Sequence, residues 1–232
     1  LTLPDKVSEQ KRNFLKALGA KLIIAPTSIA PEDPRSYYRV ADKLARETKN
    51  SYQPDQYSNA ANPKAHYETT GPHIWKETNG QITHVIITMG TGGTISGIGK
   101  YLKGKNPQIK VIGVDHIGSV YKTYFETGKL PKGTKSFKTE GFGEDFLPKT
   151  ANLSVIDEIY EIDDKESFVA ARNFAKEEGV LIVGSSGAAL AVAGKVVQKM
   201  EKGLIVVVMP DTGTNYLSKF YNDEWIKKEG FL

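Results

Sequence analysis

Cysteine is absent from all 232 residues. This absence excludes disulfide bonds, thiolate metal sites and a cysteine nucleophile, and it agrees with a reducing compartment. No apolar run approaches the length of a membrane span, and no basic segment followed by an apolar one marks a signal peptide. We therefore expect a cytoplasmic protein without a membrane partner.

Histidine is scarce, with four residues in the chain: His66, His73, His84 and His116. Their spacing matches no metal-binding motif, so we expect no bound metal. The turn Val183–Ala188 (V-G-S-S-G-A) resembles the nucleophile elbow of hydrolases, but Ala188 replaces its closing glycine. Such an enzyme also needs a histidine later in the chain, and none follows. A hydrolase is therefore excluded.

The net charge of +4 could suggest a nucleic-acid partner. Four of the lysines gather between Gly128 and Glu140, at positions 129, 132, 135 and 138. No aromatic stacking pattern or recognition helix accompanies them, so we interpret the cluster as a solvated loop. We expect no nucleic-acid partner.

Short apolar segments alternate along the chain with segments of helical periodicity. The strands are expected at residues 1–4, 21–25, 84–88, 111–114, 158–162, 181–183 and 204–209. The helices are expected at residues 8–18, 34–48, 64–77, 94–102, 163–178 and 186–200, with a loop over 126–150. Nearly continuous apolar strands between helices predict an α/β fold: an open parallel sheet with helices on both faces.

Gly90-Thr91-Gly92-Gly93-Thr94 follows one of these strands and precedes a helix. Glycines allow the backbone N–H groups to approach a ligand, and the helix N-terminus favours an anion, so the loop predicts phosphate binding. The dinucleotide-binding fingerprint G-x-G-x-x-G is incomplete, because Ile95 stands in the place of its third glycine. The sequence does not match the P-loop motif either. Asp115, 23 residues after Gly92, stands where a ribose-binding acid is expected. An NAD-binding oxidoreductase domain thus stays open as an alternative.

Two further polar turns follow expected strands, one at Ser185 and one at Asp211. Ser185 is either a hydroxyl that contacts a ligand or an ordinary helix N-cap. Since the carboxyl ends of parallel strands share one edge of a sheet, the three turns predict a single small-molecule site there.

Several segments resemble one known family in register. They are M-G-T-G-G-T-I-S-G at 89–97, Q-Y-S-N-A-A-N-P at 56–63, E-G-F-G-E-D-F-L-P at 140–148 and the stretch from 178 to 187. Together they resemble the pyridoxal-phosphate β-family, the group of O-acetylserine sulfhydrylase and cystathionine β-synthase. The resemblance extends over nearly the whole chain, and details between 210 and 225 are similar to the cystathionine β-synthase branch.

The resemblance implies a fold-type II, tryptophan synthase β-like architecture that binds pyridoxal 5'-phosphate. Residues 1–70 would be the remainder of a smaller N-terminal lobe and residues 71–232 the larger cofactor-binding lobe. It also implies a homodimer whose partners are small amino-acid and thiol substrates.

The resemblance also implies roles for individual residues. The cofactor-binding residues would be Gly90, Thr91, Gly92, Gly93, Thr94, Ser185 and Asp211, with the loop on the phosphate and Ser185 on the pyridine nitrogen. Gln56 and Gly141 would bind the substrate. Asp115 would then be a structural residue at a strand end.

The implied reaction is β-replacement on serine or an activated serine, through an aminoacrylate, with cystathionine or cysteine as product. The family's S-x-K motif, which carries the Schiff-base lysine, and its T-S-G-N-T-G substrate loop do not occur here. No catalytic residue is therefore assignable, and we expect an incomplete catalytic domain that lacks its N-terminal part. The alternative is a non-catalytic fragment or pseudo-enzyme that only binds the cofactor.

Overall fold

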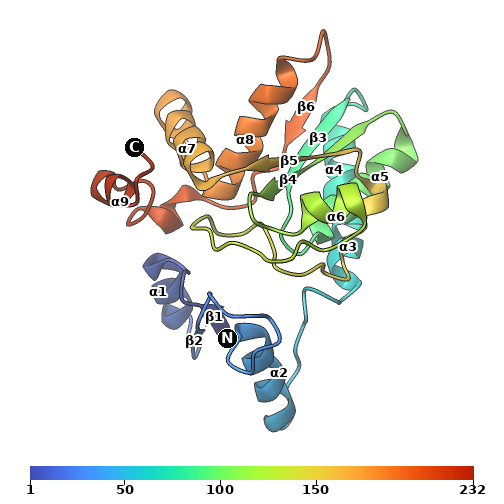
Figure 1. The fold of residues 1–232 in the computed structure, drawn as a ribbon. Helices are drawn as coiled ribbons and strands as arrows, with labels where there is room; N and C mark the ends of the chain where they lie inside the picture. Colours follow the sequence, from blue (N-terminus) through green and yellow to red (C-terminus); the bar gives the residue numbers. More distant parts are fainter.

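The computed structural model describes residues 1–232 and contains two parallel sheets. The larger sheet has the strand order β5-β4-β3-β6, and the smaller one pairs β1 with β2. Figure 1 shows helices on both sides of the larger sheet, with the smaller sheet and its two helices below it. The predicted α/β fold with parallel strands and flanking helices is confirmed.

The larger sheet is built from β3 (His84–Thr88), β4 (Lys110–His116), β5 (Glu158–Ile162) and β6 (Ile205–Val207). All its ladders are parallel, and Ile86 at the centre of β3 stands opposite Ile112 on one side and Val207 on the other. The middle residues of β3 are fully buried, as expected for a parallel sheet covered on both faces.

Alternate residues of the central strands enter two different cores. Val85, Ile87 and Val111 pack in one cluster with Ile95, Ile98 and Leu102 of α5 (Gly93–Lys105). Ile86, Ile112 and Val114 pack in the other with the small side chains of α8 (Gly184–Val197). Because successive strand residues point to opposite faces, the two clusters place α5 and α8 on opposite sides of the sheet.

Helix α7 (Asp164–Glu178) packs along α8, and its start confirms a sequence prediction. The Asp163 side chain accepts a hydrogen bond of 2.8 Å from the Glu166 backbone N–H, which caps the helix. The C-terminal segment, with η3 (Gly213–Tyr216) and α9 (Asp223–Lys228), covers α7 through a third apolar cluster centred on Phe168 and Phe220.

The smaller sheet consists of β1 (Thr2–Pro4) and β2 (Ile23–Ala25), joined by α1 (Glu9–Ala17) and followed by α2 (Tyr37–Glu47). Ser8 caps α1 by accepting a hydrogen bond from the Lys11 N–H, as its sequence predicted. The division into lobes at residues 70 and 71 stays a prediction.

The helix predicted over 64–77 is present, begins three residues earlier and contains a π-helical turn. The structure has α3 (Ala61–Ala65), a π-helical turn η1 (His66–Thr70) and α4 (Gly71–Glu77). Within the π turn, His66 Nδ1 lies 3.0 Å from the Thr70 hydroxyl and His66 Nε2 lies 3.1 Å from the hydroxyl of Thr94 in the glycine loop. Such turns often occur at functional sites.

The strand predicted at 181–183 is wrong. Ile182 forms only an isolated antiparallel bridge with Thr212, because the Tyr221 hydroxyl occupies the backbone N–H and C=O of Ile182. Helix α6 (Tyr121–Thr127) was not predicted, since its seven residues are too few to show a helical period. The loop expected over 126–150 is present after Thr127, and η2 (Leu153–Val155) follows it.

None of the helices combines the length and the apolar character that crossing a membrane requires.

Candidate functional site

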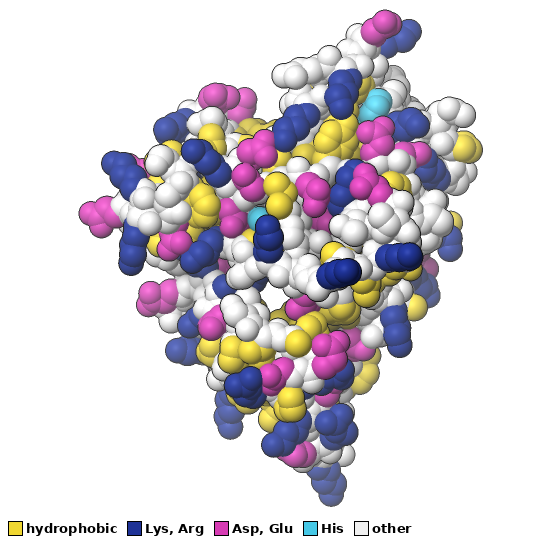
Figure 2. All heavy atoms as spheres, viewed as in Figure 1, with side chains coloured by type: hydrophobic (Ala, Val, Ile, Leu, Met, Phe, Trp, Pro, Cys, Tyr) yellow, Lys and Arg dark blue, Asp and Glu magenta, His cyan; other side chains and the backbone are white.

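A cavity of about 950 Å³ lies between the smaller sheet and the larger one. One wall is formed by β1, α1 through Lys11 and Leu15, residues 27–31 and the start of α2. The other is formed by the glycine loop and residues 134–145. Figure 2 shows a hollow in the surface between the lower part of the molecule and the rest. The cavity is therefore at the carboxyl edge of the large sheet, where open α/β folds bind their ligands.

The glycine loop presents its backbone N–H groups at the start of α5. Gly92 is the N-cap and has φ +77°, a left-handed conformation that glycine adopts without strain. The N–H groups of Gly92, Thr94 and Ile95 have no acceptor within the chain. Free N–H groups at a helix N-terminus, together with the helix dipole, suit a phosphate.

The carbonyl groups of this loop are held away from the ligand side. The Tyr121 hydroxyl donates to the Gly90 carbonyl and the Thr150 hydroxyl to the Thr91 carbonyl, both at 2.6 Å. Because a trans peptide points its C=O and the next N–H in opposite directions, these bonds orient the N–H groups of Thr91 and Gly92 away from Tyr121 and Thr150.

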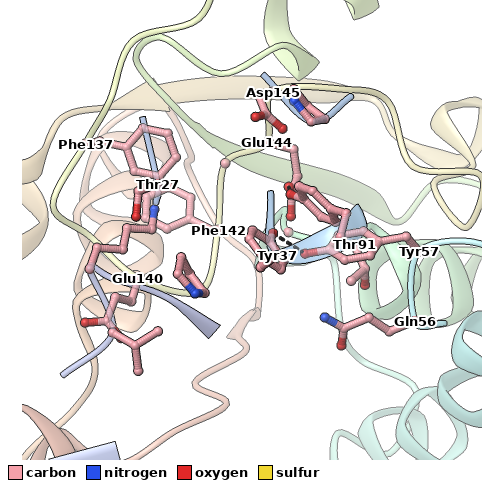
Figure 3. A pocket seen from close by; sticks show the side chains of 18 of the residues that line it. Thr27, Tyr37, Gln56, Tyr57, Thr91, Phe137, Glu140, Phe142, Glu144 and Asp145 are labelled. Carbon is pink, nitrogen blue, oxygen red and sulfur yellow. Dashed lines mark hydrogen bonds between the residues drawn. The ribbon is translucent and has the colours of Figure 1, made fainter. Parts of the chain in front are cut away.

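The Gln56 segment is joined to the glycine loop through one side chain. Asn62 Nδ2 donates to the Gln56 carbonyl at 2.8 Å and to Thr91 Oγ1 at 3.0 Å. Since Thr91 Oγ1 accepts this bond, its own proton is available for a ligand. In Figure 3 the Gln56 amide points into the cavity on the same side as Thr91.

Gly141 and Ser185 lie next to each other at the inner end of the cavity. Gly141 has φ +94°, and a Cβ added there would stand 3.7 Å from Ser185 Oγ. Ser185 belongs to the first turn of α8 and is 2% exposed. The Ser185 hydroxyl therefore lies just behind the cavity wall, and glycine at 141 leaves open the space beside it.

The structure thus brings together most of the site residues predicted from the sequence. Gln56, Gly90, Thr91, Gly92, Thr94 and Gly141 line the cavity, and Ser185 borders it. Gly93 does not line it, because the Asn62 side chain covers this glycine: a Cβ there would stand 2.0 Å from Asn62 Oδ1. The roles of these residues stay predictions.

Asp211 has a different environment from the one expected for a cofactor ligand. Its carboxylate forms an ion pair of 3.1 Å with Lys11 of α1 and accepts hydrogen bonds from Thr212 N–H and the Asn215 amide. It does not line the cavity. Asp211 thus joins its own segment, after β6, to α1 on the other side of the cavity.

Sequence reasoning missed several side chains on the cavity wall, above all Glu144 and Lys6. Burial raises the pKa of the Glu144 carboxyl to about 8; the neighbouring Asp145 carboxyl adds to this shift and Lys6 opposes it. Glu144 stands inside the E-G-F-G-E-D motif, so its position was visible in the sequence. Its place on the same cavity as Lys6 was not, because 138 residues separate the two.

A group of tyrosines lines the cavity near Glu144. The Tyr37 and Tyr57 hydroxyls are hydrogen-bonded to each other at 3.0 Å, and Tyr38 donates to Glu144 Oε2 at 3.4 Å. Figure 3 shows Tyr37 and Tyr57 side by side. Burial raises the pKa of Tyr57 to about 12 and raises those of Tyr37 and Tyr38 further. All three therefore stay protonated near neutral pH and can act as hydrogen-bond donors.

Asp115, the residue that supported a dinucleotide, does not line the cavity. It is fully buried, and its two carboxylate oxygens accept hydrogen bonds of 2.9 Å from the N–H groups of His116 and Lys122. Both oxygens are thus occupied by the chain itself, and neither is free to bind a ribose. Asp115 therefore gives no support to the NAD-binding alternative.

Comparison with known proteins agrees with this geometry. The family model described as pyridoxal-phosphate dependent enzyme matches residues 1–211. The chain is 42% identical to the cystathionine beta-synthase of Dictyostelium discoideum and 40% identical to that of Oryctolagus cuniculus, over 100% of its own length. It is 39% identical to the cysteine synthase of Buchnera aphidicola, over 94% of its length and 68% of that protein.

The chain covers 46% and 42% of the two cystathionine beta-synthases, less than half of each. The family match, in contrast, extends over almost the whole chain, and it includes the glycine loop, Gln56, Gly141 and Ser185. The chain belongs to the pyridoxal-phosphate dependent enzyme family.

Proposed function

We propose that the protein catalyses β-replacement on serine or an activated serine, with a thiol as the second substrate. The observation that carries this proposal is the placement, around one cavity, of an anion-binding loop at the start of α5, the Gln56 amide and a neutral hydroxyl at Ser185. The similarity to cystathionine beta-synthases and to a cysteine synthase supports it.

The residues present fit pyridoxal phosphate. The free N–H groups of Gly92, Thr94 and Ile95, with the Thr91 hydroxyl, would hold the phosphate. A side chain at Gly141 would stand beside Ser185 Oγ, where the pyridine ring is expected, so glycine there keeps that space open. When bound, the cofactor supplies an electron sink that allows a proton to leave Cα of the amino acid.

The chain's own side chains would orient the reactants and set how strongly the cofactor withdraws electrons. Ser185 would hydrogen-bond to the pyridine nitrogen as a neutral group and leave it largely unprotonated, unlike a carboxylate in that place. The Gln56 amide would donate to the carboxylate of the first substrate. The half-buried tyrosines Tyr37, Tyr38 and Tyr57, with the buried Phe142, would exclude water from the reacting atoms.

We assign no lysine within residues 1–232 to the covalent attachment of the cofactor or to proton removal from Cα, since none stands in the expected motif. A non-catalytic, cofactor-binding protein is the second candidate, and the same observation favours it. Cytoplasmic location and a homodimer accompany the main proposal.

Borohydride reduction of the purified full-length protein tests the proposal, because it converts any Schiff base into a stable adduct. Peptide mapping by mass spectrometry would then locate the modified lysine. An adduct outside residues 1–232, with turnover of serine and a thiol, is the expected result. Cofactor binding without an adduct would support the non-catalytic candidate, and an adduct on Lys6 or another lysine of this segment would contradict our assignment.

A further inference from the structure

Four lysines bring positive charge to the region where the two sides of the cavity meet: Lys11 and Lys219 are paired, Lys135 is exposed on its loop, and Lys6 is the fourth. Lys11 forms an ion pair of 3.1 Å with Asp211, and Lys219 pairs with Glu140 at 2.5 Å while also donating to the Lys6 carbonyl. Lys6 lines the cavity, is half-buried, and forms no ion pair or side-chain hydrogen bond within the chain.

The surroundings of Lys6 leave its ammonium group without an anionic partner. Its Nζ lies 4.2 Å from the centroid of the Phe137 ring, a cation–π contact that uses none of its three N–H donors. Burial lowers the pKa of Lys6, and the carboxylates of Glu144, Glu140 and Asp164 act against this shift. A carboxylate on a bound ligand would stabilise a half-buried ammonium in this position.

Glu144 lies on the same cavity and is also incompletely paired. The only side chain that donates to it is Tyr38, at 3.4 Å. No ion pair joins it to Lys6, so their charged atoms are more than 4.0 Å apart. Beside it, Asp145 Oδ1 is buried without a hydrogen-bond partner. Figure 3 shows Glu144 and Asp145 together, apart from Phe137 and Glu140.

Lys6 can bind an anionic group and Glu144 a cationic group, and the two side chains line one cavity without contacting each other. A zwitterionic ligand has one group for each of them. This inference rests on the proposed function. We propose that Glu144 and Lys6 determine specificity for the second substrate, an amino-acid thiol. Glu144 accepts hydrogen bonds from the α-ammonium of this substrate, and Lys6 donates to its α-carboxylate.

The first substrate would bind away from Lys6. Gln56 lies on the side of Thr91 in Figure 3, whereas Phe137, over whose ring the Lys6 ammonium lies, is on the opposite side of the cavity. Inorganic sulfide has neither an ammonium nor a carboxylate group. Its use should therefore be independent of Glu144 and Lys6.

The test uses the full-length protein loaded with pyridoxal phosphate and compares Glu144→Gln and Lys6→Met with wild type. Glu126→Gln and Lys16→Met, outside the cavity, are the matched controls. Serine is the first substrate, and the thiols are homocysteine, 4-mercaptobutyrate, which lacks the α-ammonium, and sulfide. The loss of a charge-assisted hydrogen bond should raise KM for homocysteine about 10- to 100-fold in Glu144→Gln.

Two further results are expected. The KM for sulfide should stay unchanged in both variants, and homocysteine should lose its advantage over 4-mercaptobutyrate in Glu144→Gln but keep it in Glu126→Gln. Equal effects on homocysteine and sulfide would overturn the proposal, as would a homocysteine KM that neither variant changes. Thermal melts of each variant separate these outcomes from misfolding.

Exchange of the serine Cα proton with deuterium, without any thiol, separates this proposal from the proposed function. Exchange in wild type and in both variants shows that the first half of the reaction is intact. If the expected differences between the thiols are then absent, only the assignment of Glu144 and Lys6 is refuted. No exchange and no turnover in wild type refutes the proposed function itself.

Discussion

Gly93→Ala adds one methyl group, and it should break the hydrogen bonds through which Asn62 joins the Gln56 segment to the glycine loop. A Cβ at this position would stand 2.0 Å from Asn62 Oδ1, 2.3 Å from its Cγ and 2.6 Å from its Nδ2. All three atoms lie beyond the Cβ of Asn62. The alanine can therefore be accommodated only if the Asn62 side chain leaves its place.

The expected magnitude follows from the bonds that Asn62 then loses. It donates to the Gln56 carbonyl and to Thr91 Oγ1, and each neutral hydrogen bond contributes about 0.5–1.5 kcal/mol. Alanine in a helix offsets about 0.5–1 kcal/mol of this loss. We expect Gly93→Ala to lower the free energy of unfolding by about 0.5–2 kcal/mol. It should also weaken pyridoxal-phosphate binding, because the Thr91 hydroxyl loses its hydrogen bond from Asn62.

Urea unfolding of the full-length protein, with and without cofactor, measures the effect on stability. Gly104→Ala in the same helix is the matched control, because a Cβ there meets no atom within 4 Å. This control should raise the free energy of unfolding by about 0.5–1 kcal/mol.

The decisive comparison is a double-mutant cycle with Asn62→Ala, which removes each of the three clashing atoms. In that background Gly93→Ala should be neutral or stabilising, as Gly104→Ala is. If Gly93→Ala costs as much in the Asn62→Ala background as in wild type, the contact between these residues does not explain the effect, and the reasoning is wrong.

Two other substitutions test the packing and electrostatics of the fold. Gly187→Ala would place a Cβ 2.1 Å from the Ser167 carbonyl oxygen, so it should separate α7 from α8 and lower the free energy of unfolding by about 1–3 kcal/mol; an unchanged urea midpoint would contradict this close contact. Although burial acts to raise the pKa of Asp164, hydrogen bonds from His116, Lys138 N–H and Thr139 lower it from 3.8 to about 2. A lowered carboxyl pKa stabilises the fold above pH 3.8, so the difference in unfolding free energy between wild type and Asp164→Asn should shrink as the pH falls from 3.8 towards 2, and a difference that grows in acid would refute this sign.

Local patterns were enough to predict much of the fold. The strands at 84–88 and 158–162 have the bounds expected for them, because continuous apolar runs between helices are typical of buried parallel strands. The N-caps at Ser8 and Asp163 were also predictable, since capping involves residues only three positions apart. The strand expected at 181–183 failed because Tyr221, from a distant segment, takes its backbone bonds.

The sequence by itself determined the class of the site. The glycine loop after a buried strand, the neutral Ser185 and the Gln56 segment indicate a phosphate-bearing cofactor and its family, since each signal depends on a few neighbouring residues whose chemistry is local.

Only the tertiary structure decided how these pieces meet. It placed Asp211 in an ion pair with Lys11 rather than on the cavity wall and covered Gly93 with Asn62. It also left Lys6 and Glu144 on the same cavity without an ion-pair partner. The physical reason is that burial, pKa and pairing depend on which side chains from distant segments share a space. That arrangement is set by the packing of the two sheets and their helices, and no pattern within one segment encodes it.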